Sequence, residues 1–114
     1  MVDREKAKIL IAELQQKTEA KKISWEPTAA QDEFVATFRG KVTFAISKFE
    51  DPNYYGDSYK LIMRDAEGRE MLSITNRTAG LEADLYSLYE GAHDSALKVD
   101  ETIDSILENL REAQ

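Results

Sequence analysis

The chain has 114 residues, of which 22 are acidic and 15 basic, so its formal net charge is −7. This length fits one domain spanning 1–114, and a hydrophobic content of 42% is enough for a core. Cysteine is absent and histidine occurs once. This composition excludes disulfide scaffolds, cysteine-ligated zinc or iron–sulfur sites and multi-histidine metal sites, and we expect no metal and no cofactor.

The negative charge is concentrated in the last third of the chain. Residues 79–114 carry nine acidic and two basic side chains. Proteins that bind nucleic acids or anionic membranes usually present basic surfaces, so we expect neither partner. No apolar run is long enough to span a bilayer, and the first residues lack the apolar segment of a secretory signal. We therefore expect a cytoplasmic protein.

Residues 3–20 are predicted to form a helix. Ala7, Leu10, Leu14 and Thr18 recur at helical spacing, and Ile11 widens this stripe. Asp3 is a plausible N-cap.

The middle of the chain is predicted to form an antiparallel meander of about five strands. A short strand over 23–26 ends at Pro27, and apolar residues alternate with polar ones in four later runs, near 34–39, 42–47, 59–64 and 71–75. Arg39-Gly40-Lys41 suits a tight hairpin, and Asp65-Ala66-Glu67-Gly68 suits a type I turn that runs into a bulge. The alternation implies one buried face and one wetter face.

The last third is predicted to be helical. Leu81, Leu85, Leu88 and Tyr89 begin an apolar stripe, which continues through Val99, Ile103, Ile106, Leu107 and Leu110. One helix of more than thirty residues would fit, but we favour two, with a break near Lys98 and Asp100 as the second N-cap. The fold class is then α+β: an N-terminal helix, the sheet and one or two C-terminal helices, with helices covering the apolar sheet face.

Several segments together resemble a family. They are Leu14, Thr18, Lys21-Lys22-Ile23-Ser24-Trp25-Glu26, the two hairpins, Leu85-Tyr86-Ser87-Leu88-Tyr89 and Ala96-Leu97-Lys98-Val99-Asp100. In this order they resemble a loose set of small uncharacterised bacterial proteins with a Lys-x-x-Trp approach to the sheet and a Leu-Tyr and Val-Asp helical end. Glu90-Gly91-Ala92-His93 departs from the basic, Arg-rich helix expected there. The resemblance implies an α+β fold and assigns neither catalytic residues nor a function.

Two aromatic features are candidate binding residues. Trp25 could anchor a partner or stack on a ring if exposed, or could close the gap between the first helix and the sheet. Tyr54 and Tyr55 lie in a predicted loop with Pro52 and Gly56, where tyrosines offer amphipathic contact area. The alternative is an ordinary hairpin loop.

Charged residues give three further candidates. Asp100, Asp104 and Glu108 share one helix face and could steer a basic partner, or could form a solvated face opposite the apolar stripe. His93 could act in acid–base chemistry with Glu90 as its better-placed neighbour, or could be a surface residue. The basic residues Arg64, Arg69, Arg77, Lys41 and Lys60 could hold a phosphate, although no glycine-rich phosphate loop occurs.

These features favour a non-catalytic module that binds a protein partner or itself. Proteins of this size and charge include immunity proteins, antitoxins and phage-borne inhibitors. The second sheet face, with Val35, Ala45, Ile62 and Met71, is semi-apolar and could form a homodimer. The alternative is a small-ligand domain that uses the Tyr54/Tyr55 loop and the sheet face. An enzyme is disfavoured because no nucleophile with a base, metal cluster or phosphate loop is found.

Overall fold

The computed structural model describes residues 4–50, 52, 53, 57–76 and 80–113, and for Asp100 the backbone alone. The predicted α+β class is confirmed. The element order is α1 (Arg4–Glu19), β1 (Glu26–Pro27), β2 (Glu33–Phe38), β3 (Val42–Glu50), β4 (Asp57–Arg64), β5 (Glu70–Thr75), α2 (Glu82–Leu97) and α3 (Val99–Glu112).

The five strands form one antiparallel meander in the order β1-β2-β3-β4-β5. Its two tight hairpins follow the turn chemistry of the sequence. Arg39 and Gly40 both have positive φ between β2 and β3, and Gly68 has φ +83° between β4 and β5. The predicted bulge is confirmed as a register shift at Met63 and Arg64.

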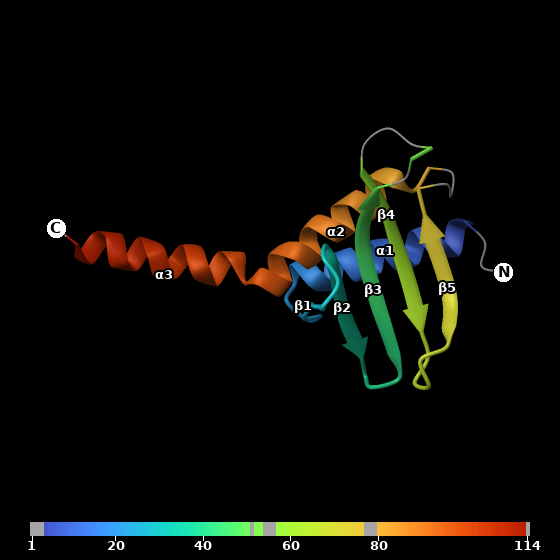
Figure 1. Cartoon of the computed structure of the whole chain (residues 1–114). Helices are drawn as coiled ribbons and strands as arrows, with labels where there is room; N and C mark the ends of the chain where they lie inside the picture. The colour runs from blue at the N-terminus through green and yellow to red at the C-terminus, as the bar shows by residue number, and fades with distance from the viewer. Residues whose placement is uncertain (1–3, 51, 54–56, 77–79, 114) are drawn as a thin grey trace.

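Helices α1 and α2 pack on one face of the sheet and leave the other face open (Figure 1). The alternation of each strand sends one set of side chains towards these helices. In register across the sheet these include Phe34, Ile46, Leu61 and Ile74, all buried. They form one core with Ile11 and Leu14 of α1 and Leu85 and Leu88 of α2.

Helix α3 does not cover the sheet. It projects from the end of α2 as a free arm (Figure 1), and every residue from Glu101 to Ala113 is exposed. The Cα radius of gyration is 15.9 Å, against about 13 Å for a compact chain of this length. The expectation that the helices cover the sheet therefore holds for α1 and α2 and is wrong for α3.

The boundaries of two elements differ from the prediction. Strand β1 is limited to Glu26–Pro27 because the backbone N–H of Trp25 donates to Ser95 Oγ (3.3 Å) instead of to a neighbouring strand. The predicted break between two C-terminal helices is confirmed. The N-cap position of α3 is Lys98, not Asp100. The predicted N-cap Asp3 lies outside the described residues.

Candidate interaction surface

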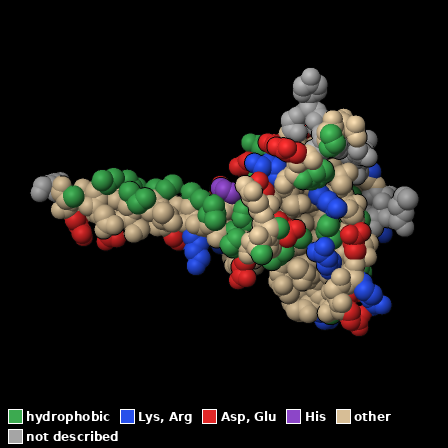
Figure 2. All heavy atoms as spheres, in the orientation of Figure 1, with side chains coloured by type: hydrophobic (Ala, Val, Ile, Leu, Met, Phe, Trp, Pro, Cys, Tyr) green, Lys and Arg blue, Asp and Glu red, His purple; other side chains and the backbone are tan. Residues whose placement is uncertain are grey.

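Among the described residues, four of the ten exposed large hydrophobic side chains belong to α3: Ile103, Ile106, Leu107 and Leu110. We call this set the α3 apolar stripe. Because Ile103 lies three and four residues before Ile106 and Leu107, and Leu110 lies four and three residues after them, the set projects from one side of the helix. Their exposed fractions run from 42% to 65%. Figure 2 shows hydrophobic side chains along one edge of α3 and acidic ones along the opposite edge.

The acidic edge contains two of the predicted site residues. Asp104 and Glu108 are both exposed and lie one turn apart on α3. The backbone of Asp100 lies one turn before Asp104, in the first turn of α3, and its side chain is not described. The predicted acidic face thus lies on a helix that is exposed to solvent on both sides, because the α3 apolar stripe opposite this face is also uncovered.

One residue sets the direction of α3. Lys98 adopts the left-handed conformation (φ 53°, ψ 49°), and its backbone N–H is directed at the carbonyls of Asp94 and Ser95 at the end of α2. Its own carbonyl accepts the Thr102 N–H at 3.0 Å, which starts α3. A positive φ is unusual for lysine. The helix axis therefore changes direction at Lys98, which carries the apolar stripe away from the core.

Trp25 is in the core of the body and does not belong to the α3 apolar stripe. Its side chain is 2% exposed, and the indole Nε1 donates to Thr18 Oγ1 at 2.8 Å. The ring is therefore not an exposed anchor. It lies in the core beside α1, which agrees with the alternative that Trp25 closes the gap between the first helix and the sheet. Tyr54 and Tyr55 lie outside the described residues.

The second sheet face is only weakly apolar. Val35, Ala45 and Ile62 are neighbours in register across β2, β3 and β4. Val35 and Ile62 are half-buried, and Ala45 is 2% exposed within its own sheet. Met71 is 57% exposed at the bulge. Of these four apolar side chains, only Met71 is exposed.

His93 belongs to an aromatic cluster between α2 and the sheet. Its ring meets Phe34 edge-on at 5.7 Å, and Tyr89 packs on both Phe34 and Tyr59. Asp94 Oδ1 lies 3.2 Å from His93 Nδ1, so the neighbour of the imidazole is Asp94 and the expectation for Glu90 is wrong. The adjacent side chains reach each other because both lie at the exposed rim of α2.

Burial controls the titration of two tyrosines in this cluster. Desolvation, with the nearby Asp32 carboxylate, raises the pKa of Tyr89 to about 12. The Tyr89 hydroxyl lies 3.4 Å from Asp32 Oδ1. Desolvation also raises the pKa of Tyr59, with a smaller contribution from Asp57. Both phenols therefore stay neutral over the physiological range and serve as packing groups.

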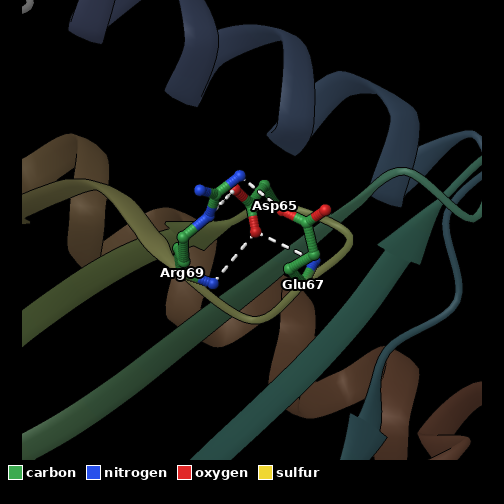
Figure 3. A network of polar contacts seen from close by, with 3 residues as sticks. All are labelled: Asp65, Glu67 and Arg69. Carbon is green, nitrogen blue, oxygen red and sulfur yellow. Dashed lines mark hydrogen bonds and ion pairs between the residues drawn. The ribbon is translucent and has the colours of Figure 1, made fainter.

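One residue of the predicted basic patch, Arg69, forms ion pairs within the turn between β4 and β5. The Arg69 guanidinium contacts both Asp65 and Glu67 (Figure 3), with its Nε 2.8 Å from Asp65 Oδ2. Asp65 Oδ1 also accepts the backbone N–H groups of Glu67 and Arg69. These bonds lower the pKa of Asp65, the Arg69 backbone bond having the largest effect. Arg69 therefore stabilises the β4–β5 turn, and Arg77 lies outside the described residues.

Two surface hollows could admit small molecules. One, of about 660 Å³, is lined by residues that include Asp57, Tyr59, Asn76 and Tyr86. The other, of about 550 Å³, lies where α3 leaves the body and is lined by residues that include Lys21, Glu26, Lys98 and Glu101. Both volumes fall in the range of ligand sites. Neither hollow includes any residue of the α3 apolar stripe.

The described residues contain neither a metal-binding cluster nor a membrane-spanning helix. No group of three or more His, Asp or Glu side chains is arranged to hold a metal ion. In the same part of the chain, no helix is both long and apolar enough to cross a membrane.

Comparison with known proteins gives no match: no protein-family model fits the chain, and no curated protein or solved structure is significantly similar to it. The resemblance to small bacterial proteins stays a prediction.

Proposed function

We propose that this protein is a non-catalytic protein–protein interaction module that presents α3 to its partner. The observation that carries this proposal is the uncovered α3 apolar stripe. Large contiguous apolar surface is uncommon on soluble monomers and marks interaction sites. Here it is displayed on a projecting arm instead of lying over the core.

The length of α3 gives a second reason. It has 14 residues, and isolated helices shorter than about 12–15 residues are marginal in water. Most helix stability in proteins comes from packing an amphipathic face. Among the described residues α3 makes few contacts with the body, so we expect its helical state to be stabilised by a bound partner.

The mode of recognition is then that of an amphipathic helix laid against an apolar surface. The apolar stripe supplies the contact, and the acidic edge stays in water. A module of this kind acts by occupying its partner, as inhibitors, immunity proteins and self-associating regulators do, and it needs no reaction chemistry of its own.

A capture experiment with matched variants tests the proposal. Ile106→Asp puts a charge in the stripe, and Ser105→Asp puts the same charge on the neighbouring residue outside it. Proteins retained from a lysate of the source cells by wild type and Ser105→Asp, but lost by Ile106→Asp, are purified and titrated directly. Partners that bind all three forms equally would contradict the proposal.

A small-ligand function is the second candidate. It is favoured by the hollow whose lining includes Asp57, Tyr59, Asn76 and Tyr86. Because Trp25 is buried, its fluorescence is a poor reporter, and amide NMR shifts of Asn76 and Tyr86 on adding a metabolite panel are the better measurement. Shifts that saturate with ligand concentration would favour this function.

A further inference from the structure

The spacing of apolar residues on α3 is that of a coiled-coil seam. Val99, Ile103, Ile106 and Leu110 are separated by four, three and four residues. This 4-3-4 order is the a/d pattern of a heptad repeat. Leu107 adds one flanking position, and the three last seam residues are 48%, 50% and 65% exposed. The seam therefore has the form that packs against another helix.

The positions of the charged residues on α3 indicate what kind of helix packs against the seam. In the same heptad numbering, Thr102 and Asn109 occupy one row of positions beside the seam, and Leu107 belongs to the other row. Glu101, Asp104, Glu108 and Glu112 all occupy outer positions. A basic partner helix would be met by carboxylates beside the seam, and from Glu101 to Glu112 there are none. Neutral flanks instead permit a second acidic chain of the same sequence to approach.

Asp100 is the one acidic residue at a flanking position. It lies in the first turn of α3, where the helix dipole favours a carboxylate without any partner. The dipole of its own helix therefore explains why an acidic residue stands at position 100, and no basic helix opposite Asp100 is required.

Orientation follows from the order of the seam and from charge. With the two helices antiparallel, Val99 faces Leu110 of the second copy and Ile103 faces Ile106, so all four seam residues are covered on both chains. In this arrangement the two helix dipoles run antiparallel, so the positive end of each lies beside the negative end of the other. It holds the two acidic bodies at opposite ends of the pair, whereas a parallel pair would bring them together.

We propose that α3 pairs with α3 of a second copy as a two-stranded antiparallel coiled coil. The pairing rests on the proposed function, because it uses the same apolar stripe. Each helix offers a footprint of about 21 by 10 Å. This is well below the roughly 800 Å² per partner of a standard interface, so the dimer should be weak and dissociate on dilution.

The test is the mass of the purified full chain in solution, by light scattering or sedimentation, from about 1 µM to 1 mM. The mass should rise from 13.0 kDa towards twice that value. Ile106→Asp should raise the dissociation constant at least about tenfold, while Ser105→Asp should change it little. A monomer at every concentration, or a dimer that Ile106→Asp leaves intact, would overturn the pairing.

Orientation is tested by oxidative cross-linking, which is clean because the chain has no cysteine. Val99→Cys mixed with a differently tagged Leu110→Cys should give a covalent pair, because these positions face each other. Neither variant alone should cross-link, since like positions lie about 16 Å apart along the antiparallel axis. Self-linkage of Val99→Cys, or no linkage in the mixture, would overturn the antiparallel arrangement.

These results separate the two proposals. A purified chain that stays monomeric, while a different protein binds wild type and Ser105→Asp but not Ile106→Asp, overturns the self-pairing and leaves the interaction module standing. A chain that neither self-associates nor binds any protein through the stripe overturns both. Circular dichroism of each variant confirms that the body is folded, which we expect because Ile106 is exposed.

Discussion

The indole N–H of Trp25 is bonded to the hydroxyl of Thr18, which itself donates to the Leu14 carbonyl at 2.7 Å. One buried hydroxyl thus joins the last turn of α1 to the segment that leads into β1. Thr18→Val keeps the shape and leaves the indole N–H unpaired, so we expect a loss of about 1–3 kcal/mol in the free energy of unfolding. Urea denaturation measures it. The exposed Thr37→Val is the control, and an equal effect of the two would contradict the assignment.

Gly91 lies inside α2, where it faces α1. A Cβ at this position would meet Thr18 Cγ2 at 3.5 Å, an ordinary contact. Gly91→Ala should therefore raise the free energy of unfolding by about 0.5–1 kcal/mol, because alanine restricts the unfolded chain and favours the helix. Thermal and urea unfolding measure the gain. Destabilisation would show that α1 and α2 approach more closely than the contact indicates.

Tyr89 gives the stability of the body a dependence on alkaline pH. Its folded pKa, about 12, lies above the ordinary value of 10.0. The protonated phenol is therefore favoured by folding, and its contribution is complete below pH 10 and lost as pH rises towards 12. Tyr89→Phe should flatten the fall in stability over this interval, and the phenolate absorbance titration should lose its highest transition. Some slope should remain because the Tyr59 pKa is also raised. An unchanged profile would contradict this.

Asp65 gives the opposite dependence at acid pH. Its folded pKa lies below the ordinary 3.8, so its contribution is present above that value and is lost as pH falls through the folded pKa. Asp65→Asn should lower stability at neutral pH and reduce the difference from wild type in strong acid. Glu67→Gln, which leaves the backbone hydrogen bonds to Asp65, is the control. The measurement is urea denaturation from neutral to acid pH.

The acidic edge of α3 should affect the rate of association more than its strength. Reversing Asp100, Asp104 and Glu108 to Lys should slow association with a basic partner and weaken the salt dependence of the on-rate. For the α3 pair, whose seam contains none of these three residues, the change should speed association by lowering the net negative charge. Stopped-flow kinetics at low and high salt measure both. Unchanged kinetics would remove the acidic edge from the account.

The fold was largely predictable because the alternation of residues such as Phe34 and Ala36, or Phe44 and Ile46, indicates one buried sheet face by itself. The break near Lys98 was also predictable. The short β1 was not, because the Trp25 backbone is held by Ser95, a tertiary contact across seventy residues.

The candidate surface was less predictable for a related reason. The periodicity of Ile103, Ile106 and Leu110 is the same whether the stripe packs on its own sheet or on another chain. The sequence signal for the second case is the pair of neutral residues beside the stripe, Thr102 and Asn109. The prediction from sequence rested instead on the acidic residues Asp100, Asp104 and Glu108. Trp25 shows the converse, since an aromatic residue near a strand start does not reveal its own burial.

The left-handed Lys98 makes the two halves of the molecule separable in evolution. Because Lys98 is not helical, inserting or deleting one residue at this joint would change the direction in which α3 leaves the body without altering the sequence of either helix. The geometry of any assembly that uses α3 is therefore encoded at a residue that is itself part of neither the core nor the seam. Related chains could keep both sequences and still build differently shaped complexes.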